Sequence, residues 1–327
     1  MVRLRIDVSY LVCGMANGNG EYAIECYGVT RRFGSFTAVS KLDLKVKKGE
    51  IFGFLGPNGA GKTTTIKMLT TLLSITEGSA KVAGLEVSTH GAGVRSKIGV
   101  VPQQFALFDE LTPMENLRYI GELYGMSKTE IKRRSDELLK IVGIYDKRDV
   151  LAGGFSGGMK QKLSVAAGLL HSPEILFMDE PTTGLDPQSR LTLRDLTKQL
   201  NDQGITIVYT THDMEEADKL CDRIAIMNLS KLVALGTPRE LREILKEGRI
   251  IEIQLERKDK KVVEEAGRLI RATSIEYTDG TILMRTNEPT AGLVSTLSHF
   301  FERKKMGVNE IMVKEPSLED VFVYVTK

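Results

Sequence analysis

The chain has 327 residues, of which 42% are hydrophobic and 27% are charged, and its formal net charge is +2. This length allows about two domains, and the near balance of charges provides no general attraction to nucleic acid or anionic lipid. No stretch approaches the roughly 18 uninterrupted apolar residues that predict a membrane-spanning helix. The cysteines, Cys13, Cys26 and Cys221, form neither a metal-binding pattern nor a disulfide framework, which suits a reducing cytosol.

The N-terminal segment, residues 1–21, reads as an extension. Charged residues interrupt the apolar ones within residues 1–12, so this part does not form the apolar core of a signal peptide. We expect Met15 to be the native start, because the recognisable fold begins near Tyr22.

Short strands are predicted next. Tyr22–Tyr27 and Lys41–Val46 alternate polar with apolar residues, and Gly34-Ser35 provides a turn between them. A second turn, Lys47–Glu50, leads into the continuous apolar run Ile51–Leu55, which predicts a buried strand.

A phosphate-binding loop follows this strand. Residues 56–63 fit the pattern G-x-x-x-x-G-K-[ST], and a run compatible with a helix, Thr64–Leu73, comes after them. The glycines allow backbone N–H groups to point at phosphate oxygens, and the helix N-terminus adds partial positive charge. Lys62 reaches the outer phosphates, and the Thr63 hydroxyl is a ligand for Mg²⁺. The residues expected to bind the nucleoside triphosphate here are Gly56, Pro57, Asn58, Gly59, Ala60, Gly61, Lys62, Thr63 and Thr64.

The periodicity of residues 104–165 is typical of helices. Pro113–Leu123 begins after Thr112, and Glu115 stands three residues later at the spacing of a capping box. Lys128–Val142 also places its apolar residues at helical intervals. We therefore expect a helical subdomain between the first motif and the next strand.

A second anion receptor is indicated at residues 155–159, Phe-Ser-Gly-Gly-Met, which precede the amphipathic helix Lys160–Leu170. Ser156 with Gly157 and Gly158 at a helix N-terminus suits a phosphate, although a plain helix cap would have the same residues. The spacing leaves open whether the two phosphate-binding segments meet within one chain or across two.

Two further apolar strands end in polar residues. Glu174–Glu180 ends in Asp179 and Glu180, and Ile205–Thr211 is followed by His212, with a helix, Pro187–Leu200, between them. Apolar strands that alternate with helices favour a parallel sheet, and ligands bind at the carboxyl ends of its strands. Asp179 then suits Mg²⁺, Glu180 a general base, and His212 a hydrogen bond to the γ-phosphate. The alternatives are a solvated acidic loop and an incidental histidine.

The pattern changes again in residues 241–327, where strands and helices are shorter. A turn at Asp279-Gly280 predicts a hairpin, and the order of the elements is β-α-β-β-α-β, which predicts a small ferredoxin-like domain. The expected elements are a strand from 250 to 255, helix Lys260–Arg271, strands Ser274–Tyr277 and Thr281–Arg285, helix Ala291–Lys304, strand Glu310–Val313 and helix Ser317–Tyr324.

Residues 22–238 closely resemble the ATP-binding cassette of ABC transporters. The motifs that carry the resemblance stand in the family's order. Gly56–Thr63 resembles Walker A, Phe155–Met159 the signature motif, Glu174–Glu180 the Walker B strand with its catalytic Glu, and Gly184–Asp186 the D-loop. In the same way His212 resembles the switch histidine, Gln103 the Q-loop glutamine, and Phe33 the aromatic residue that stacks on adenine.

The resemblance implies an α/β fold, with a P-loop ATPase domain of mixed sheet over residues 22–240, a helical subdomain over about 104–165, and an accessory α+β domain over 241–327. It implies a catalytic set of Lys62, Gln103, Glu180 and His212, and Thr63, Gln103 and Asp179 as ligands of Mg²⁺. It also implies a head-to-tail dimer that holds ATP between one subunit's Walker motifs and the other's Ser156, Gly157, Gly158 and Asp186.

The partners implied are a second copy of the chain and an integral membrane permease that docks in the groove near Gln103, at the cytoplasmic face of the membrane; nucleic acid is not implied. Phe155 and Met159 depart from the signature's usual Leu and Gln, but the phosphate-binding Ser and Gly residues are kept. Met159, together with the C-terminal segment from Glu315 to Phe322, resembles ATPase subunits of ABC-2-type, daunorubicin-resistance-type exporters.

Two other functions compete with this interpretation. A soluble ABC-type ATPase acting on nucleic acid or ribosomes is disfavoured by the single cassette and the absence of a basic tail. A nucleotide-gated sensor is disfavoured because the C-terminal domain shows no recognisable catalytic residues. The sequence does not name the cargo, and it does not distinguish a homodimer from a heterodimer of cassettes.

Overall fold

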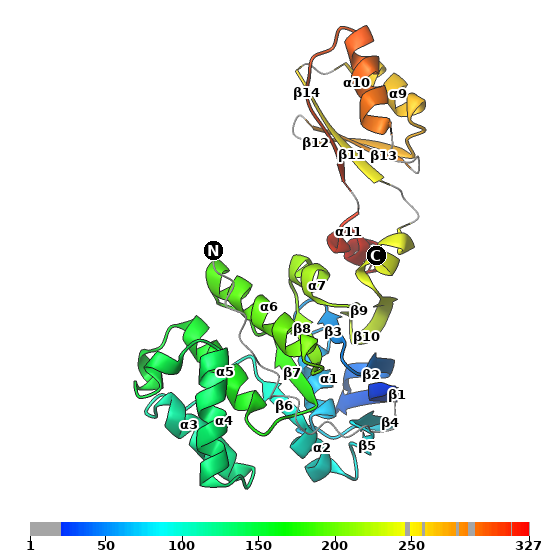
Figure 1. Cartoon of the computed structure of the whole chain (residues 1–327). Helices are drawn as coiled ribbons and strands as arrows, with labels where there is room; N and C mark the ends of the chain where they lie inside the picture. The colour runs from blue at the N-terminus through cyan, green and yellow to red at the C-terminus, as the bar shows by residue number, and fades with distance from the viewer. Residues whose placement is uncertain are drawn as a thin grey trace. The chain divides into compact units, whose positions relative to one another are not determined.

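The structure is a computed structural model, and it describes residues 21–245, 249–256, 259–278, 281–286, 292–314 and 316–326. The chain divides into two compact units after Pro238, and Figure 1 shows the elements of each. Of the expected N-terminal extension, only Glu21 belongs to the described residues, and Met15 lies outside them. The expected turn at Asp279-Gly280 also lies outside the described residues.

The first sheet of the larger unit is antiparallel and has the order β2-β1-β4-β5. Its strands are β1 (Tyr22–Phe33), β2 (Phe36–Lys47), β4 (Glu77–Val82) and β5 (Leu85–Glu86). The first two strands are longer than expected because their pairing continues to the Gly34-Ser35 turn, where Phe33 pairs with Phe36, although the register shifts at several points and the alternation is lost near the turn.

The second sheet is the mixed sheet that the family resemblance implies, with the order β10-β9-β3-β8-β7-β6. All neighbours pair in parallel except β10, which is antiparallel to β9. Every residue of β3, β7 and β8 is buried, which explains their continuous apolar character. The strands are β3 (Ile51–Leu55), β6 (Ile98–Val101), β7 (Ile175–Asp179), β8 (Thr206–Thr211), β9 (Arg223–Asn228) and β10 (Lys231–Gly236).

Both faces of this mixed sheet are covered. On one face Phe54 and Phe177 share a hydrophobic core with Ile66 of α1 and with the antiparallel sheet. On the other face the Thr197 hydroxyl of α6 contacts the Met178 sulfur of β7. The helices around the sheet are α1 (Lys62–Leu69), α2 (Gly91–Lys97), α6 (Pro187–Asp202) and α7 (Met214–Leu220).

A separate group of helices forms the subdomain expected over residues 104–165, and Figure 1 shows it to one side of the sheets. It contains α3 (Pro113–Leu123), α4 (Lys128–Ile141) and α5 (Gly157–Leu169), with short 3-10 turns at Tyr145–Lys147 and Ala152–Gly154. The Thr112–Glu115 capping box is present.

The expectation of helix was wrong for residues 104–112, which form a loop. The buried Asn116 side chain holds this loop, since its oxygen accepts from the Phe108 N–H at 2.9 Å and its amide donates to the Phe108 and Leu111 carbonyls. These side-chain bonds replace the backbone bonds of a helix.

The smaller unit has the predicted order of elements and a four-stranded antiparallel sheet, β12-β13-β11-β14. Ile251, Ile282, Val263 and Phe301 belong to a single core that joins the sheet to α9 and α10. This is the ferredoxin-like arrangement. The elements are α8 (Pro238–Ile244), β11 (Arg249–Leu255), α9 (Lys260–Leu269), β12 (Ser274–Thr278), β13 (Thr281–Thr286), α10 (Leu293–Arg303), β14 (Val308–Lys314) and α11 (Leu318–Thr326).

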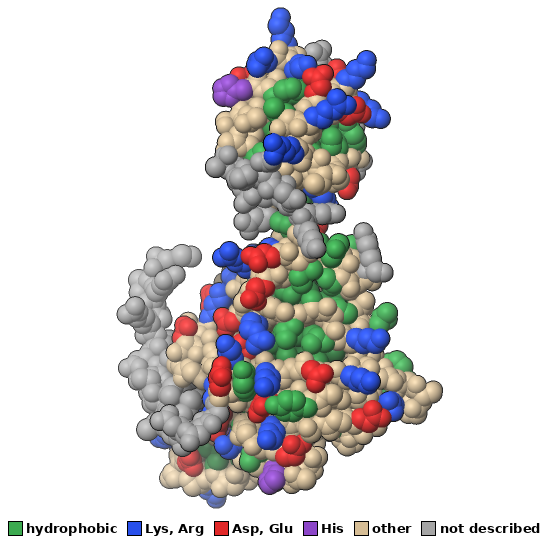
Figure 2. Space-filling model, turned by 90° about the vertical axis from the view of Figure 1, so that its right-hand side faces the viewer, with side chains coloured by type: hydrophobic (Ala, Val, Ile, Leu, Met, Phe, Trp, Pro, Cys, Tyr) green, Lys and Arg blue, Asp and Glu red, His purple; other side chains and the backbone are tan. Residues whose placement is uncertain are grey.

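The surface of the larger unit is mixed in character on the side that carries β1, β2 and β10. Figure 2 shows hydrophobic side chains gathered there, with charges of both signs around them. Val233 and Leu235 of the edge strand β10 are 37% and 38% exposed. Within the described part of the chain, no helix combines the length and the apolarity that crossing a membrane requires.

Phe301 offers a test of the smaller unit's core. Its side chain is fully buried and stacks edge-to-face on Phe300, with ring centroids 5.4 Å apart. We expect Phe301→Ala to destabilise this unit by about 3–5 kcal/mol, because the neighbours cannot fill the cavity. Hydrogen exchange read by mass spectrometry should show faster exchange in residues 249–314 only. Val294→Ala, on the same helix but 40% exposed, is the control, and equal exchange in the two variants would contradict this core.

Candidate nucleotide-binding site

The loop of residues 56–61 joins the end of β3 to the start of α1. A Cβ atom at Gly56 would lie 2.3 Å from the Met227 carbonyl oxygen, and one at Gly61 would lie 2.5 Å from the Ala38 carbonyl oxygen. Gly61 also has a φ of +106°, a left-handed conformation that suits glycine. The loop is therefore pressed so closely against β2 and β9 that side chains are excluded at both positions.

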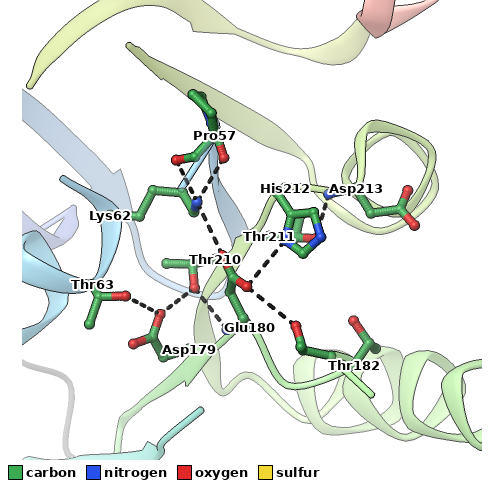
Figure 3. Close-up of polar contacts among 12 residues, drawn as sticks. Pro57, Lys62, Thr63, Asp179, Glu180, Thr182, Thr210, Thr211, His212 and Asp213 are labelled. Carbon is green, nitrogen blue, oxygen red and sulfur yellow. Dashed lines mark hydrogen bonds and ion pairs between the residues drawn. The ribbon is translucent and has the colours of Figure 1, made fainter. Parts of the chain in front are cut away.

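The Lys62 side chain lies inside this loop and is only 4% exposed. Its ammonium donates to the carbonyls of Gly56 at 2.7 Å and Pro57 at 3.2 Å. It also forms an ion pair with Glu180, with 3.1 Å between Nζ and Oε1, as Figure 3 shows. These contacts bring the first motif against the carboxylates at the end of β7.

Asp179 is the centre of a second set of contacts. Its Oδ1 accepts from the Thr63 hydroxyl at 3.1 Å and from the Thr210 hydroxyl at 2.6 Å. The Thr210 hydroxyl in turn accepts from the Glu180 backbone N–H at 2.9 Å. Thr210 thus orients both carboxylate residues, and it is a site residue that the motif search missed. The signal available in the sequence was the cluster of hydroxyls at the end of an otherwise apolar strand.

Glu180 has a backbone φ of +45°, which is rare for a residue with a side chain and marks local strain. Its Oε2 accepts from His212 Nδ1 at 3.1 Å, so this nitrogen carries the proton, and from the Thr183 hydroxyl at 3.3 Å. Burial raises the pKa of the Glu180 carboxyl, but the Lys62 ammonium and His212 lower it by more, and the net pKa lies below its ordinary value. The carboxyl is therefore ionised near neutral pH.

The other loop residues that are expected to bind nucleotide differ in exposure. Pro57, Asn58 and Gly59 form the exposed tip of the loop, whereas Ala60 is buried and Thr64 is half-buried. Loop and helix thus leave the tip open to solvent.

Two of the expected residues stand apart from the Lys62–Glu180 contacts. Phe33 is 46% exposed at the end of β1, and the Arg31 guanidinium lies 4.5 Å from the centroid of its ring. Gln103 is exposed just after β6, and it takes no part in the hydrogen bonds and ion pairs given above for the described residues.

A second cluster contains the start of α5 and the start of α6. Ser156 caps α5 by accepting from the Met159 N–H at 3.3 Å, and a Cβ atom at Gly158 would lie 2.4 Å from the Ser189 hydroxyl. Asp186 caps α6 by accepting from the Ser189 N–H and hydroxyl at 2.9 and 2.6 Å, and these bonds lower the pKa of its carboxyl. Gly157 is exposed beside them.

The Lys62–Glu180 ion pair makes stability depend on pH. Because the folded pKa of Glu180 lies below the ordinary value of 4.5, the pair stabilises the fold above that pH, and this contribution is lost as the pH falls through the folded pKa. In thermal unfolding without nucleotide, we expect the wild type to have a higher Tm than Glu180→Gln near neutral pH, and we expect this difference to shrink as the pH falls below 4.5. Glu215→Gln, at an exposed ion pair, is the control, and a gap that widens in acid would contradict the ion pair.

Comparison of the chain with known proteins shows the family to which it belongs. The family described as ABC transporter matches residues 39–183. The linearmycin resistance ATP-binding protein LnrL of Bacillus subtilis is 43% identical over 218 residues, which are 67% of this chain and 70% of that protein. The daunorubicin/doxorubicin resistance ATP-binding protein DrrA of Streptomyces peucetius is 38% identical over 309 residues, which are 93% of this chain and 92% of that protein.

A solved structure described as the ATP binding subunit of an ABC transporter shares the fold. It has a TM-score of 0.63 and 28% sequence identity, and the match covers 68% of this chain and 93% of that one. The similarity to DrrA spans both units, since it covers 93% of the chain. The chain therefore belongs to the family of ATP-binding subunits of ABC transporters and is an ATPase.

Proposed function

We propose that this chain dimerises on ATP and drives a separate transmembrane permease that exports a drug, lipid or other small molecule. The observation that carries the proposal is the contact of Lys62, Glu180 and His212 where β3, β7 and β8 end. The resistance functions printed in the names of LnrL and DrrA support export of a drug-like cargo. The proposed localisation is peripheral, at the cytoplasmic face of the membrane.

Lys62 links nucleotide binding to the chemistry. A phosphate that enters the loop would compete with Glu180 for the Lys62 ammonium, because this buried cation already forms an ion pair with Glu180. Lys62 then stabilises the charge of the transferring phosphoryl group. Glu180, with its ion pair weakened, regains basicity and orients or deprotonates the attacking water, while His212 would donate a hydrogen bond to the γ-phosphate.

The residues present fit a magnesium ion. Thr63 and Asp179 offer a hydroxyl and a carboxylate oxygen 3.1 Å apart, and Mg²⁺ prefers such oxygen ligands together with substrate phosphates. Thr63 and Asp179 would hold the ion, and Gln103, which lies outside their contacts, would complete the set on approach. When bound, Mg²⁺ neutralises charge on the β- and γ-phosphates.

The two clusters support a head-to-tail dimer. The described residues include no hydrogen bond or ion pair between the Lys62–Glu180 contacts and the Ser156–Asp186 cluster, so the second cluster is available to a nucleotide on another copy. Ser156 and Asp186 are both exposed. One kind of chain carries both halves, so a homodimer has two complete sites, and hydrolysis adds like charges that reopen it.

The segment after Gln103 supports docking of the permease. Phe105 and Phe108 are 37% and 46% exposed, and Phe108 stacks edge-to-face on Tyr119, which is 44% exposed. Exposed aromatic side chains that adjoin a loop suit the apolar face of a short helix from a partner. The proposed partners are this permease and a second copy of the chain, with no role for nucleic acid.

Substitution of Glu180 and Lys62 separates binding from hydrolysis. Glu180→Gln should bind ATP, hydrolyse it at least about 100-fold more slowly, and accumulate as a dimer, because the base is lost and the phosphate contacts are kept. Lys62→Ala should weaken ATP binding itself. ATP titration, phosphate release and gel filtration measure the three properties. Normal turnover by Glu180→Gln, or unchanged ATP affinity in Lys62→Ala, would refute the assigned role.

Thr210 tests the support of the two carboxylates. Thr210→Val keeps the shape of the side chain but removes the hydroxyl that contacts Asp179 and the Glu180 N–H. We expect phosphate release to slow about 10-fold or more, as for loss of groups that orient metal ligands. Thr210→Ser keeps the hydroxyl and should stay close to wild type. Equal rates in the two variants would show that the hydroxyl does not matter.

The permease interaction can be tested from native membranes. We expect the tagged chain, purified in mild detergent, to bring a polytopic membrane protein with it, because the aromatic surface near Gln103 provides the contact. Phe108→Ser should lower the yield of that partner, and Leu229→Ser, which changes another exposed apolar residue, should not. A chain that purifies alone, or with ribosomes or nucleic acid, would contradict the transporter function and leave the ATPase activity in place.

A further inference from the structure

Glu216 of α7 makes an unusual set of contacts next to the site. Its Oε2 accepts from the hydroxyls of Thr182 at 3.0 Å and Thr211 at 2.8 Å, and its Oε1 accepts from the Tyr209 hydroxyl at 2.8 Å. These three donors are almost completely buried, and they come from two separate segments, the loop after β7 and strand β8. One carboxylate thus joins two segments that adjoin the reacting groups.

Capping of α7 does not explain these contacts. Glu216 stands three residues after the N-cap Asp213, where a Glu commonly reaches back to the N-cap N–H. Here the Asp213 N–H donates to the Thr211 hydroxyl at 3.0 Å, and Asp213 accepts from the Glu216 N–H at 3.0 Å. The helix start is therefore satisfied without the Glu216 carboxylate, which is left to accept the three hydroxyls.

The contacts lie one and two residues from the groups that do the chemistry. Thr182 follows Glu180 by two positions, and Thr211 directly precedes His212. Burial, and then the negative charge of Glu216, raise the pKa of Tyr209 well above its ordinary value, so its hydroxyl stays protonated and remains a donor. A shift of either segment would change the 3.1 Å contact between Glu180 and His212.

We propose that Glu216 is a positioning residue that sets the distance between Glu180 and His212, and thereby the rate of ATP hydrolysis. The proposal rests on the roles of Glu180 and His212 in the proposed function. Glu216 contacts neither of the two directly in the bonds above, and it acts through the hydroxyls of Thr182 and Thr211. The phosphate-binding loop is held by other contacts, so ATP affinity does not depend on Glu216.

The test compares Glu216→Ala, Glu216→Gln and the neighbouring Glu215→Ala in the full chain. Phosphate release from Mg-ATP is measured and divided by the number of ATP-binding sites, so that loss of folded protein is removed from the rate. Glu216→Ala should lower kcat about 10-fold or more and leave KM for ATP within about twofold, because misplacement of Glu180 and His212 acts on the chemical step.

Two control variants are expected to keep activity. Glu216→Gln should retain at least about a third of kcat, since its amide oxygen can accept hydrogen bonds from both threonine hydroxyls and its NH₂ can donate to the Tyr209 oxygen. Glu215→Ala, which loses only an exposed ion pair with Lys219, should match wild type.

A double-mutant cycle with His212→Ala separates positioning from plain stability. If Glu216 acts through His212, then Glu216→Ala should cost clearly less in the His212→Ala background than in wild type. Equal costs in the two backgrounds, a rise in KM that accounts for the loss, or wild-type kcat in Glu216→Ala would each overturn the proposal. Failure of the underlying site would look different, because His212→Ala and Glu180→Gln would then themselves hydrolyse ATP normally.

Discussion

The buried ammonium of Lys62 is the constraint on which the site depends. A cation removed from water requires hydrogen-bond acceptors and a counter-charge, and here two loop carbonyls and Glu180 supply them. The loop must therefore curl back on its own lysine, and β7 must end near the end of β3. The intervening strand β8 meets this condition, since it pairs with both. It contributes Thr210, and His212 follows it at the same edge of the sheet.

Prediction from the sequence succeeded for the elements whose local residue pattern matches their burial in the folded protein. Ile51–Leu55 is a buried strand as expected, and Thr112 begins a helix with its capping box. The pattern did not reveal β4, where only Ala80 and Val82 are buried, or the loop before α3, where Asn116 replaces helical bonds. Among the site residues, the motifs led to Lys62, Asp179 and Glu180. They could not lead to Thr210 or Glu216, because the importance of a hydroxyl in an apolar strand, or of one acid among several on a short helix, depends on partners distant in sequence.

The fold separates the tasks of an ATPase subunit among its layers. The parallel part of the mixed sheet gathers the charged groups at one edge, and the antiparallel sheet carries Phe33 at the end of β1. The helical subdomain, together with the loop before α3, carries Ser156 and the exposed aromatic side chains near Gln103. The smaller unit has its own core and sheet, so its stability does not require the charged groups of the site.

The close approach of Gly158 to Ser189 has a mechanical consequence. A Cβ atom at Gly158 would lie 2.4 Å from the Ser189 hydroxyl, and Ser189 is bound to Asp186, so a shift of the start of α5 towards α6 would press on the residue that is bound to Asp186. In a head-to-tail pair, the Ser156 that meets one nucleotide would therefore move together with the Asp186 of the same subunit. The close packing at this one glycine would in this way couple the two nucleotide sites of the pair. Binding of a nucleotide at one site would then change the geometry of the other, and the two sites would not hydrolyse ATP independently.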